Sequence, residues 1–354
     1  MQAAARHRTL TSALGHDLTL RPFAAGESVG CAAAVFERMD PMKRAFVFPG
    51  QGSQSVGMGR DLAAAFPAAR LLFEEIDEAL RQNLSRLMFE GPEDELTLTE
   101  NAQPAIMAAS LAVMRVLESE ANVRIADVCA LVAGHSMGEY AALAAAGVFA
   151  PADAARLLKL RGQAMQRAVP VGQGAMAALL GLELADAQAV AAEAAGEQVC
   201  AAANDNAPGQ VVVSGDKAAV ERAVQLAAAK GARRSILLPV SAPFHCPLMQ
   251  PAADVMAQAL ADIPMLAPLV PLVANVTAAE VVDPAEIRDL LVQQVTGLVR
   301  WRESVIYMKG REVEMLAEIG SGKILTGLAR RIDREMTAVA VGTPEDIDSF
   351  VKGL

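Results

Sequence analysis

The residues best suited to covalent chemistry lie in a glycine-flanked turn, Gly-His-Ser-Met-Gly at 134–138. An apolar stretch at 128–133 precedes the turn and predicts a strand, and a helix-forming stretch follows at 139–146. A serine on a sharp strand-to-helix turn places its hydroxyl at a helix N-terminus, where free N–H groups stabilise negative charge. The pattern favours Ser136 as a nucleophile for acyl transfer over an ordinary strand-to-helix turn.

A serine nucleophile needs a base, and the chain has only four histidines. His7 and His16 lie in an N-terminal stretch that has no regular pattern. His135 is adjacent to Ser136, so its side chain should point away and serve in packing or in a supporting hydrogen bond. His245 remains, with a proline two residues away on either side to fix its backbone. We therefore expect His245 to be the base.

An oxyanion hole requires two N–H donors near the nucleophile. The backbone N–H of Met137, which follows the serine, is the first candidate. The second is the N–H of Gln51, in a glycine-rich loop at 49–54 after a short apolar strand at 44–48. Without a role in an oxyanion hole, a glycine-rich loop of this kind would be an ordinary turn.

The elements that must position these residues alternate between strand and helix, which predicts an α/β fold with a mainly parallel sheet. The stretch 168–243 has its own order: strand 175–182, helix 185–195, strands 199–203 and 210–214, helix 217–230 and strand 234–240. This β-α-β-β-α-β order is that of a ferredoxin-like unit. It predicts a small domain at 168–243, inserted into a core of 42–167 and 244–354, with the site at their junction.

Residues 1–41 show no sustained period and lack the features of a secretory signal. We expect them to form a disordered extension, and Met39 and Met42 are candidate start residues.

The formal net charge is −10, which argues against nucleic acid and anionic membranes as partners. No apolar run is long enough for a membrane span, so we expect a cytoplasmic protein. The four cysteines, Cys31, Cys129, Cys200 and Cys246, form no C-x-x-C pair and are expected to be free thiols. A Cys246–His245 dyad is geometrically poor because neighbouring side chains diverge.

Taken together, these residues resemble the acyltransferase family of fatty acid and polyketide synthesis, over nearly all of 42–354. Within that family, the stand-alone members that move malonyl from malonyl-CoA to acyl carrier protein are the most similar. The resemblance rests on Phe-Pro-Gly-Gln-Gly-Ser-Gln at 48–54, Gly-His-Ser-Met-Gly-Glu-Tyr at 134–140, Arg161-Gly162, Met165-Gln166, Asn-Ala-Pro-Gly-Gln at 206–210, Phe244-His245-Cys246, Gln294, Trp301 and Glu-Ile-Gly-Ser-Gly-Lys at 318–323.

The resemblance implies an α/β-hydrolase-like core with an inserted ferredoxin-like domain. It implies that Ser136 carries the acyl group, that His245 is its base, and that the carbonyl of Gln294 orients the histidine. Gln51 and Met137 would supply the oxyanion N–H groups. Arg161 would bind the malonyl carboxylate, since a planar guanidinium grips a carboxylate with two parallel hydrogen bonds. Without the resemblance, Arg161 would be read as a solvated helix residue.

The resemblance further implies that Phe244, which precedes the histidine, favours an unbranched malonyl group. The chemistry needs no metal and no other cofactor, and we expect a monomer. Two alternatives stay open: a serine esterase or thioesterase, in which water accepts the acyl group, and a non-enzymatic domain that has kept the fold. The first would normally require an acidic residue between the nucleophile and the histidine and a histidine nearer the chain end, and Arg161 and the Gly-Gln-Gly loop count against it.

Overall fold

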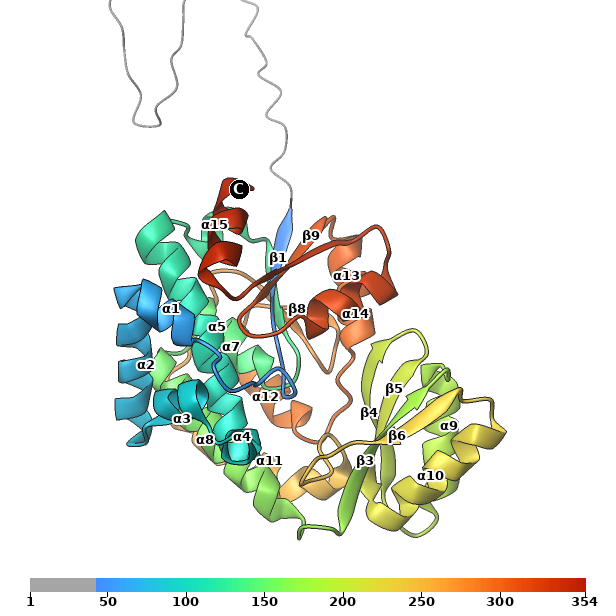
Figure 1. Ribbon diagram of the computed structural model, residues 1–354. Helices are drawn as coiled ribbons and strands as arrows, with labels where there is room; N and C mark the ends of the chain where they lie inside the picture. Colours follow the sequence, from blue (N-terminus) through green and yellow to red (C-terminus); the bar gives the residue numbers. More distant parts are fainter. Residues whose placement is uncertain (1–42) are drawn as a thin grey trace, which may run out of the picture. The chain divides into compact units, whose positions relative to one another are not determined.

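The computed structural model describes residues 43–354, and within them the central element is a six-stranded sheet of order β10-β9-β1-β2-β7-β8 (Figure 1). Neighbouring strands are parallel, apart from the antiparallel pair β7–β8. The strands are β1 (Arg44–Phe48), β2 (Leu131–Gly134), β7 (Leu272–Ala274), β8 (Ala279–Val281), β9 (Met315–Ile319) and β10 (Thr337–Val341). The chain therefore has the mixed α/β fold with a mainly parallel sheet that its sequence predicts.

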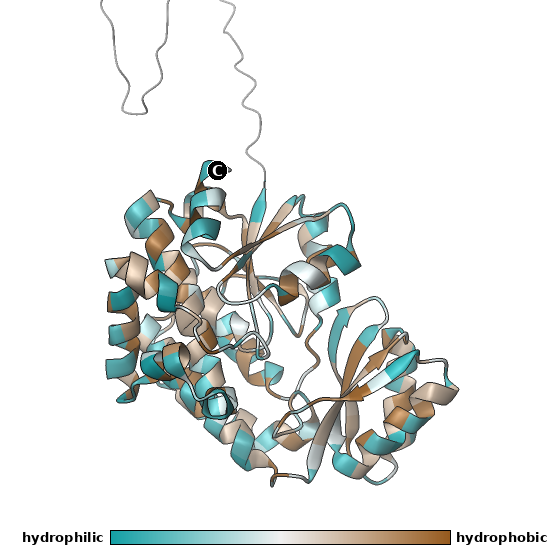
Figure 2. Cartoon of the chain, viewed as in Figure 1, coloured by the Kyte–Doolittle hydropathy of each residue, from teal (hydrophilic) through white to brown (hydrophobic). Residues whose placement is uncertain are grey.

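Helices cover both faces of this sheet. Phe46 and Phe48 of β1 belong to one hydrophobic cluster and Ala45 and Val47 to another, because successive strand residues face opposite sides. Hydrophobic residues accordingly dominate the central strands in Figure 2. The helices around the sheet are α1 (Arg60–Ala65), α2 (Pro67–Leu80), α3 (Leu84–Glu90), α4 (Glu93–Thr97), α5 (Thr99–Ala121), α6 (Ile125–Val128), α7 (Gly138–Ala145), α8 (Pro151–Ala168), η1 (Pro247–Met249), α11 (Gln250–Ala261), α12 (Pro284–Gln294), α13 (Trp301–Gly310), α14 (Ile324–Ile332) and α15 (Pro344–Lys352).

A separate antiparallel sheet of order β4-β5-β3-β6 is built from the stretch between α8 and η1. Its two helices pack against it around a third hydrophobic cluster. The elements follow in the predicted order: β3 (Gly174–Leu180), α9 (Leu184–Ala195), β4 (Cys200–Ala207), β5 (Gln210–Asp216), α10 (Lys217–Ala229) and β6 (Arg234–Leu237).

Three predicted boundaries differ from the structure. The strand expected at 128–133 begins only at Leu131, because Ile125–Val128 is the short helix α6. β4 continues to Ala207, so only Pro208 and Gly209 separate it from β5. The last strand ends at Leu237, and the expected residues 238–240 leave the sheet.

Three consecutive residues of β4 join the small sheet to the core. Asn204 forms a parallel bridge with Val299, and the Asp205 carboxylate accepts a hydrogen bond from Arg302 Nε at 2.9 Å. Asn206 Oδ1 lies 2.8 Å from Nε2 of His135. The small sheet is thus fixed beside the turn that carries the candidate nucleophile.

Within residues 43–354, no helix combines the length and the apolar character that a membrane span requires. Cys129, Cys200 and Cys246 are free and buried, as expected. The expectations for residues 1–41, His7, His16 and Cys31 fall outside the described residues.

Candidate active site

Ser136 lies in the turn between β2 and α7, with its backbone in the left-handed region at φ 52°. The two flanking glycines are sterically required. A Cβ at Gly134 would lie 1.9 Å from the carbonyl carbon of Gly138, and a Cβ at Gly138 would lie 2.2 Å from the Phe48 carbonyl oxygen. The turn can therefore press against β1 and point the serine hydroxyl outward from the sheet edge.

The structure brings the predicted base to the predicted nucleophile. His245 Nε2 lies 2.7 Å from Ser136 Oγ, and its Nδ1 lies 2.8 Å from the backbone carbonyl oxygen of Gln294. Burial, followed by the nearby charge of Arg161, lowers the pKa of His245 to about 3. The imidazole is therefore neutral at physiological pH, and the carbonyl acceptor favours the tautomer whose Nε2 can take a proton from the serine.

Arg161 lies on α8 and is 1% exposed, so it is not the solvated helix residue that it could have been. Its Nη2 donates to Ser136 Oγ at 3.2 Å and to the side-chain oxygen of Gln294 at 2.8 Å. Its Nη1 donates to Oε1 of Gln103, on α5, at 2.9 Å. A cation is thus fixed beside the nucleophile, in position for an anionic group on an acyl substrate.

The Arg161-Gly162 pair has a steric explanation. A Cβ at Gly162 would lie 2.6 Å from Cα of Glu100 on α5. The absence of a side chain there lets α8 and α5 cross closely, which places Arg161 opposite Gln103.

Both predicted oxyanion donors border the same cavity as Ser136. Within residues 43–354, neither the Gln51 N–H nor the Met137 N–H has a hydrogen-bond acceptor. Met137 immediately precedes α7, so its N–H belongs to the electropositive end of that helix. These two N–H groups are available to a developing oxyanion.

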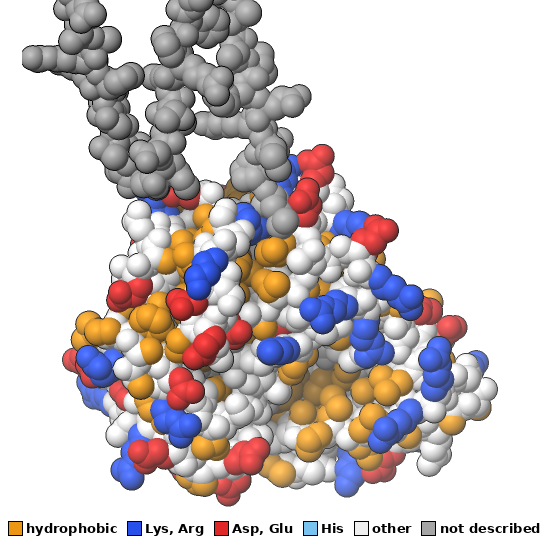
Figure 3. Space-filling model, turned by 45° about the horizontal axis from the view of Figure 1, so that its top comes forward, with side chains coloured by type: hydrophobic (Ala, Val, Ile, Leu, Met, Phe, Trp, Pro, Cys, Tyr) orange, Lys and Arg blue, Asp and Glu red, His pale blue; other side chains and the backbone are white. Residues whose placement is uncertain are grey.

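The cavity has a volume of about 320 Å³ and is mainly apolar away from the reacting groups. Phe244, 9% exposed, forms part of its wall beside His245. Figure 3 shows one face of the molecule, where hydrophobic side chains gather in a hollow with Lys and Arg side chains beside it. The remaining lining residues are Gly52, Gln54, Thr97, Gln103, His135, Met165, Met176, Asn204, Leu238, Pro239 and Val240.

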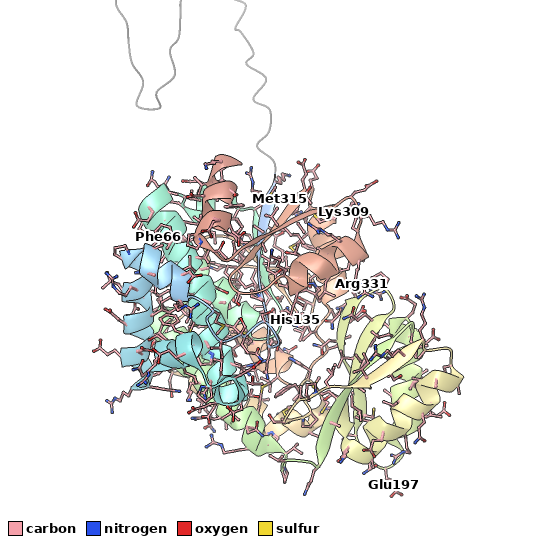
Figure 4. The ribbon with its side chains drawn as sticks, in the orientation of Figure 1. Phe66, His135, Glu197, Lys309, Met315 and Arg331 are labelled. Carbon is pink, nitrogen blue, oxygen red and sulfur yellow. The ribbon has the colours of Figure 1, made fainter. Side chains whose placement is uncertain are left out.

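His135 has the supporting hydrogen bond and packing that the sequence suggested, and Cys246 has a partner other than His245. Figure 4 places His135 between the core and the small sheet, where it bonds Asn206 and lies against Trp301 with ring centroids 5.7 Å apart. The Cys246 thiol donates to the Pro243 carbonyl at 3.1 Å, and burial raises its pKa. Cys246 is therefore poorly suited to act as a nucleophile.

Sequence reasoning missed three polar residues that support the site: Gln103, Glu139 and Asn275. Asn275 accepts a hydrogen bond from the Ser136 N–H at 2.8 Å and donates to the Gly134 carbonyl at 2.7 Å. Gln103 is a buried polar residue directly before the apolar run 104–109 of α5, and Asn275 directly follows the buried strand β7. Polar residues in those settings are a usable signal, because buried polar groups need partners.

Comparison with protein families matches residues 45–322 to the acyl transferase domain. The malonyl CoA-acyl carrier protein transacylase of Escherichia coli K12 is 49% identical over 300 residues, which cover 85% of this chain and 96% of that protein. An acyl-carrier-protein-S-malonyltransferase from Bartonella henselae is 55% identical, with a TM-score of 0.86 over 88% of this chain and 99% of its own.

A third similar structure contains a partner protein. It is a type II PKS acyl-carrier protein in complex with its malonyl-transacylase, matched at 43% identity and a TM-score of 0.85, over 88% of this chain and 100% of the matched chain. These structures also combine a parallel-sheet core with a separate antiparallel sheet, the coarse architecture seen here.

Proposed function

The chain belongs to the acyl transferase domain family and is an acyltransferase, and we propose that it moves malonyl from malonyl-CoA to acyl carrier protein through an ester on Ser136. The observation that carries the proposal is that Ser136 Oγ lies within hydrogen-bond reach of both His245 and Arg161. A base and a carboxylate anchor thus meet at one nucleophile. The named relatives act on the same donor and acceptor, which supports this choice of substrates.

In the first half-reaction, His245 Nε2 takes the proton of Ser136 as Oγ attacks the thioester carbonyl carbon. The negative charge that forms on the carbonyl oxygen is stabilised by the N–H groups of Gln51 and Met137. The carbon–sulfur bond then breaks, and the CoA thiolate takes the proton back from His245. The malonyl group remains as an ester on Ser136.

In the second half-reaction, the pantetheine thiol of acyl carrier protein gives its proton to His245 and attacks the ester carbonyl. Collapse of the intermediate releases Ser136 Oγ, which recovers the proton. The Gln294 carbonyl keeps the imidazole oriented throughout, so no acidic third member is needed. The products, CoA and malonyl-carrier protein, supply extender units for fatty acid synthesis.

Substrate choice is divided between two residues in this proposal. Arg161 binds the malonyl carboxylate, and Phe244 crowds the α-carbon against branched acyl groups. Both residues border the cavity that Ser136 and His245 also line, which supports the division.

The finer fold assignment also belongs to the proposal. Residues 42–167 and 244–354 form an α/β-hydrolase-like core, and 168–243 form an inserted ferredoxin-like domain. The β-α-β-β-α-β order and the strand order β4-β5-β3-β6 support the second assignment.

Mass spectrometry after mixing with malonyl-CoA tests the chemistry. One malonyl mass should appear on a peptide that contains Ser136, and Ser136→Ala should abolish both the adduct and the transfer to carrier protein. Ser349→Ala, at an exposed serine on α15, is the matched control and should change neither. Release of free malonate without transfer would instead indicate a thioesterase, and an adduct on Cys246 would overturn the assignment.

A further inference from the structure

Glu139 is a buried carboxylate, 1% exposed, in the first turn of α7, three residues after the nucleophile. An acidic residue at this place usually interacts with the N-terminus of its own helix. Here the carboxylate accepts hydrogen bonds from two distant residues. The Asn275 N–H donates to Oε1 at 2.6 Å, and Nε2 of Gln294 donates to Oε2.

These two partners hold the reacting groups. The Asn275 side chain fixes the Ser136 turn through its contacts with the Ser136 N–H and the Gly134 carbonyl. Gln294 accepts from Arg161 through its side chain, donates to the Ser136 carbonyl at 2.8 Å, and accepts from His245 through its backbone. Glu139 therefore touches no reacting atom but holds both residues that position them.

Glu139 also has an electrostatic relation to Arg161. Within the described residues, Arg161 forms no ion pair, and its hydrogen-bond partners Gln103, Gln294 and Ser136 are all neutral. The Gln294 side-chain amide lies between the two charges, since its oxygen faces Arg161 and its nitrogen faces Glu139. The Gln294 amide thus bridges the Arg161 guanidinium and the Glu139 carboxyl group.

A substrate carboxylate on Arg161 would add a second anion to this enclosed site. Buried carboxylates that share one site do not both remain ionised. The other titratable groups here are His245, which is neutral, and Tyr140, whose pKa burial raises to about 12. Burial also raises the pKa of Glu139 to about 8, although the Asn275, Gln294 and Arg161 contacts oppose the rise. Glu139 is the group in this network that can take up a proton.

We propose that Glu139 is a positioning residue that balances the charge of Arg161 only in its ionised form, and that this form takes up one proton when a substrate carboxylate binds Arg161. The inference rests on the proposed function, since it assigns that carboxylate to malonyl. In this proposal, binding of a diacid thioester is coupled to the uptake of one proton, whereas binding of a neutral acyl group is not.

Calorimetry of Ser136→Ala enzyme with malonyl-CoA, in buffers of different ionisation enthalpy, measures the proton directly. Uptake should be near zero at about pH 6.5, where Glu139 is already protonated, and near one proton at about pH 9. Acetyl-CoA carries the same CoA charges without the carboxylate and should show no such rise. Equal uptake for the two ligands would overturn the inference.

Kinetics provides a second readout. The KM for malonyl-CoA should rise up to about tenfold per pH unit above pH 8, because the proton becomes harder to acquire, while the KM for acetyl-CoA stays flat. Glu139→Gln should flatten the malonyl profile, and Glu100→Gln, at a carboxylate paired with Lys159 outside the site, should keep it. Malonyl transfer with a flat wild-type profile would refute the coupling alone, whereas absence of malonyl transfer would refute the proposed function.

Discussion

Arg161 is a fully buried guanidinium whose direct hydrogen-bond partners are all neutral. Removing a charge from water is costly, and burial accordingly lowers the pKa of Arg161. An anionic group on a substrate would compensate for that cost. The residue is therefore better explained by selection of an acyl group than by stability of the fold.

Arg161→Ala should reduce malonyl transfer several hundredfold, because loss of one partner of a buried ion pair costs about 3–5 kcal/mol. Acetyl transfer should be unchanged or improved, since acetyl has no carboxylate for Arg161 to bind. Competition assays with both acyl-CoAs measure the ratio. Arg156→Ala, at an exposed arginine on the same helix, is the control and should preserve the preference. Full selectivity in Arg161→Ala would place the carboxylate anchor elsewhere.

At the scale of single residues, the sequence was most informative about roles that residue type and local pattern are enough to identify. Ser136 and His245 could be selected because a glycine-flanked serine and a single unassigned histidine leave few choices. Arg161 could be assigned a role only through the family resemblance. Glu139 was included in a helix-forming stretch and in the motif at 134–140 but received no role, since its partners Asn275 and Gln294 lie far along the chain and no local pattern predicts those contacts.

Among the elements, the β2–α7 turn depends most on close backbone contact. It places α7 against β1 without room for a side chain at Gly138. Among the described glycines, Gly215 and Gly342 make comparable demands, since a Cβ there would lie 2.0 Å from the Val199 carbonyl oxygen and 2.3 Å from the Gly320 carbonyl oxygen, respectively, whereas others make none. Gly327, in the interior of α14, is exposed and has open space where a Cβ would stand.

Gly138→Ala should lower the free energy of unfolding by about 1–3 kcal/mol or more and impair acylation, since a Cβ would overlap the β1 backbone. Gly327→Ala should raise stability by about 0.5–1 kcal/mol, because alanine restricts the unfolded chain and favours a helix. Urea unfolding of both variants checks the contrast. Equal free energies of unfolding for the two variants would show that the turn accommodates a Cβ at Gly138 without loss of stability.

The order of the elements in the small sheet followed from apolar runs and turn residues, but some boundaries did not. β4 extends through Asn204, Asp205 and Asn206, a polar run that is typical of a loop. Each of these residues finds a partner in the core or on its helices, and those tertiary contacts outweigh the local preference. Tertiary contacts of this kind cannot be predicted from the strand or loop propensities of the residues alone.

For the whole molecule, the family resemblance implies an acidic carrier protein, and its docking to a chain of net charge −10 would require a local basic surface. Arg331 on α14, labelled in Figure 4, bonds Gln210 at 2.7 Å. The adjoining Gly209 packs near Gly181, which is in contact with Arg233. Arg331, Arg233 and Arg234 are exposed and form no ion pair among the described residues, whereas Lys230 approaches Glu193 at 3.8 Å. We take these three arginines as the candidate docking surface.

Combined Arg331→Glu and Arg234→Glu should raise the KM for carrier protein by about tenfold, since each exposed charge contributes up to about 1 kcal/mol. Formation of the Ser136 adduct from malonyl-CoA should be unchanged. Added salt should raise the wild-type KM, because exposed charges are screened within about 8 Å at physiological ionic strength. Arg124→Glu on α6, whose partner Asp127 lies in the same short helix, is the control. An unaffected KM and no salt effect would exclude this surface.

The attachment of β4 to the core has a consequence for how the active site is organised. A rotation of the small sheet would have to break the Asn204–Val299 bridge, the Asp205–Arg302 ion pair and the Asn206–His135 contact together. Ser136 Oγ lies within hydrogen-bond distance of both His245 and Arg161. The conformational entropy of arranging these side chains is therefore lost during folding. Acyl-CoA then binds a preorganised site, and no closing movement is needed to assemble it.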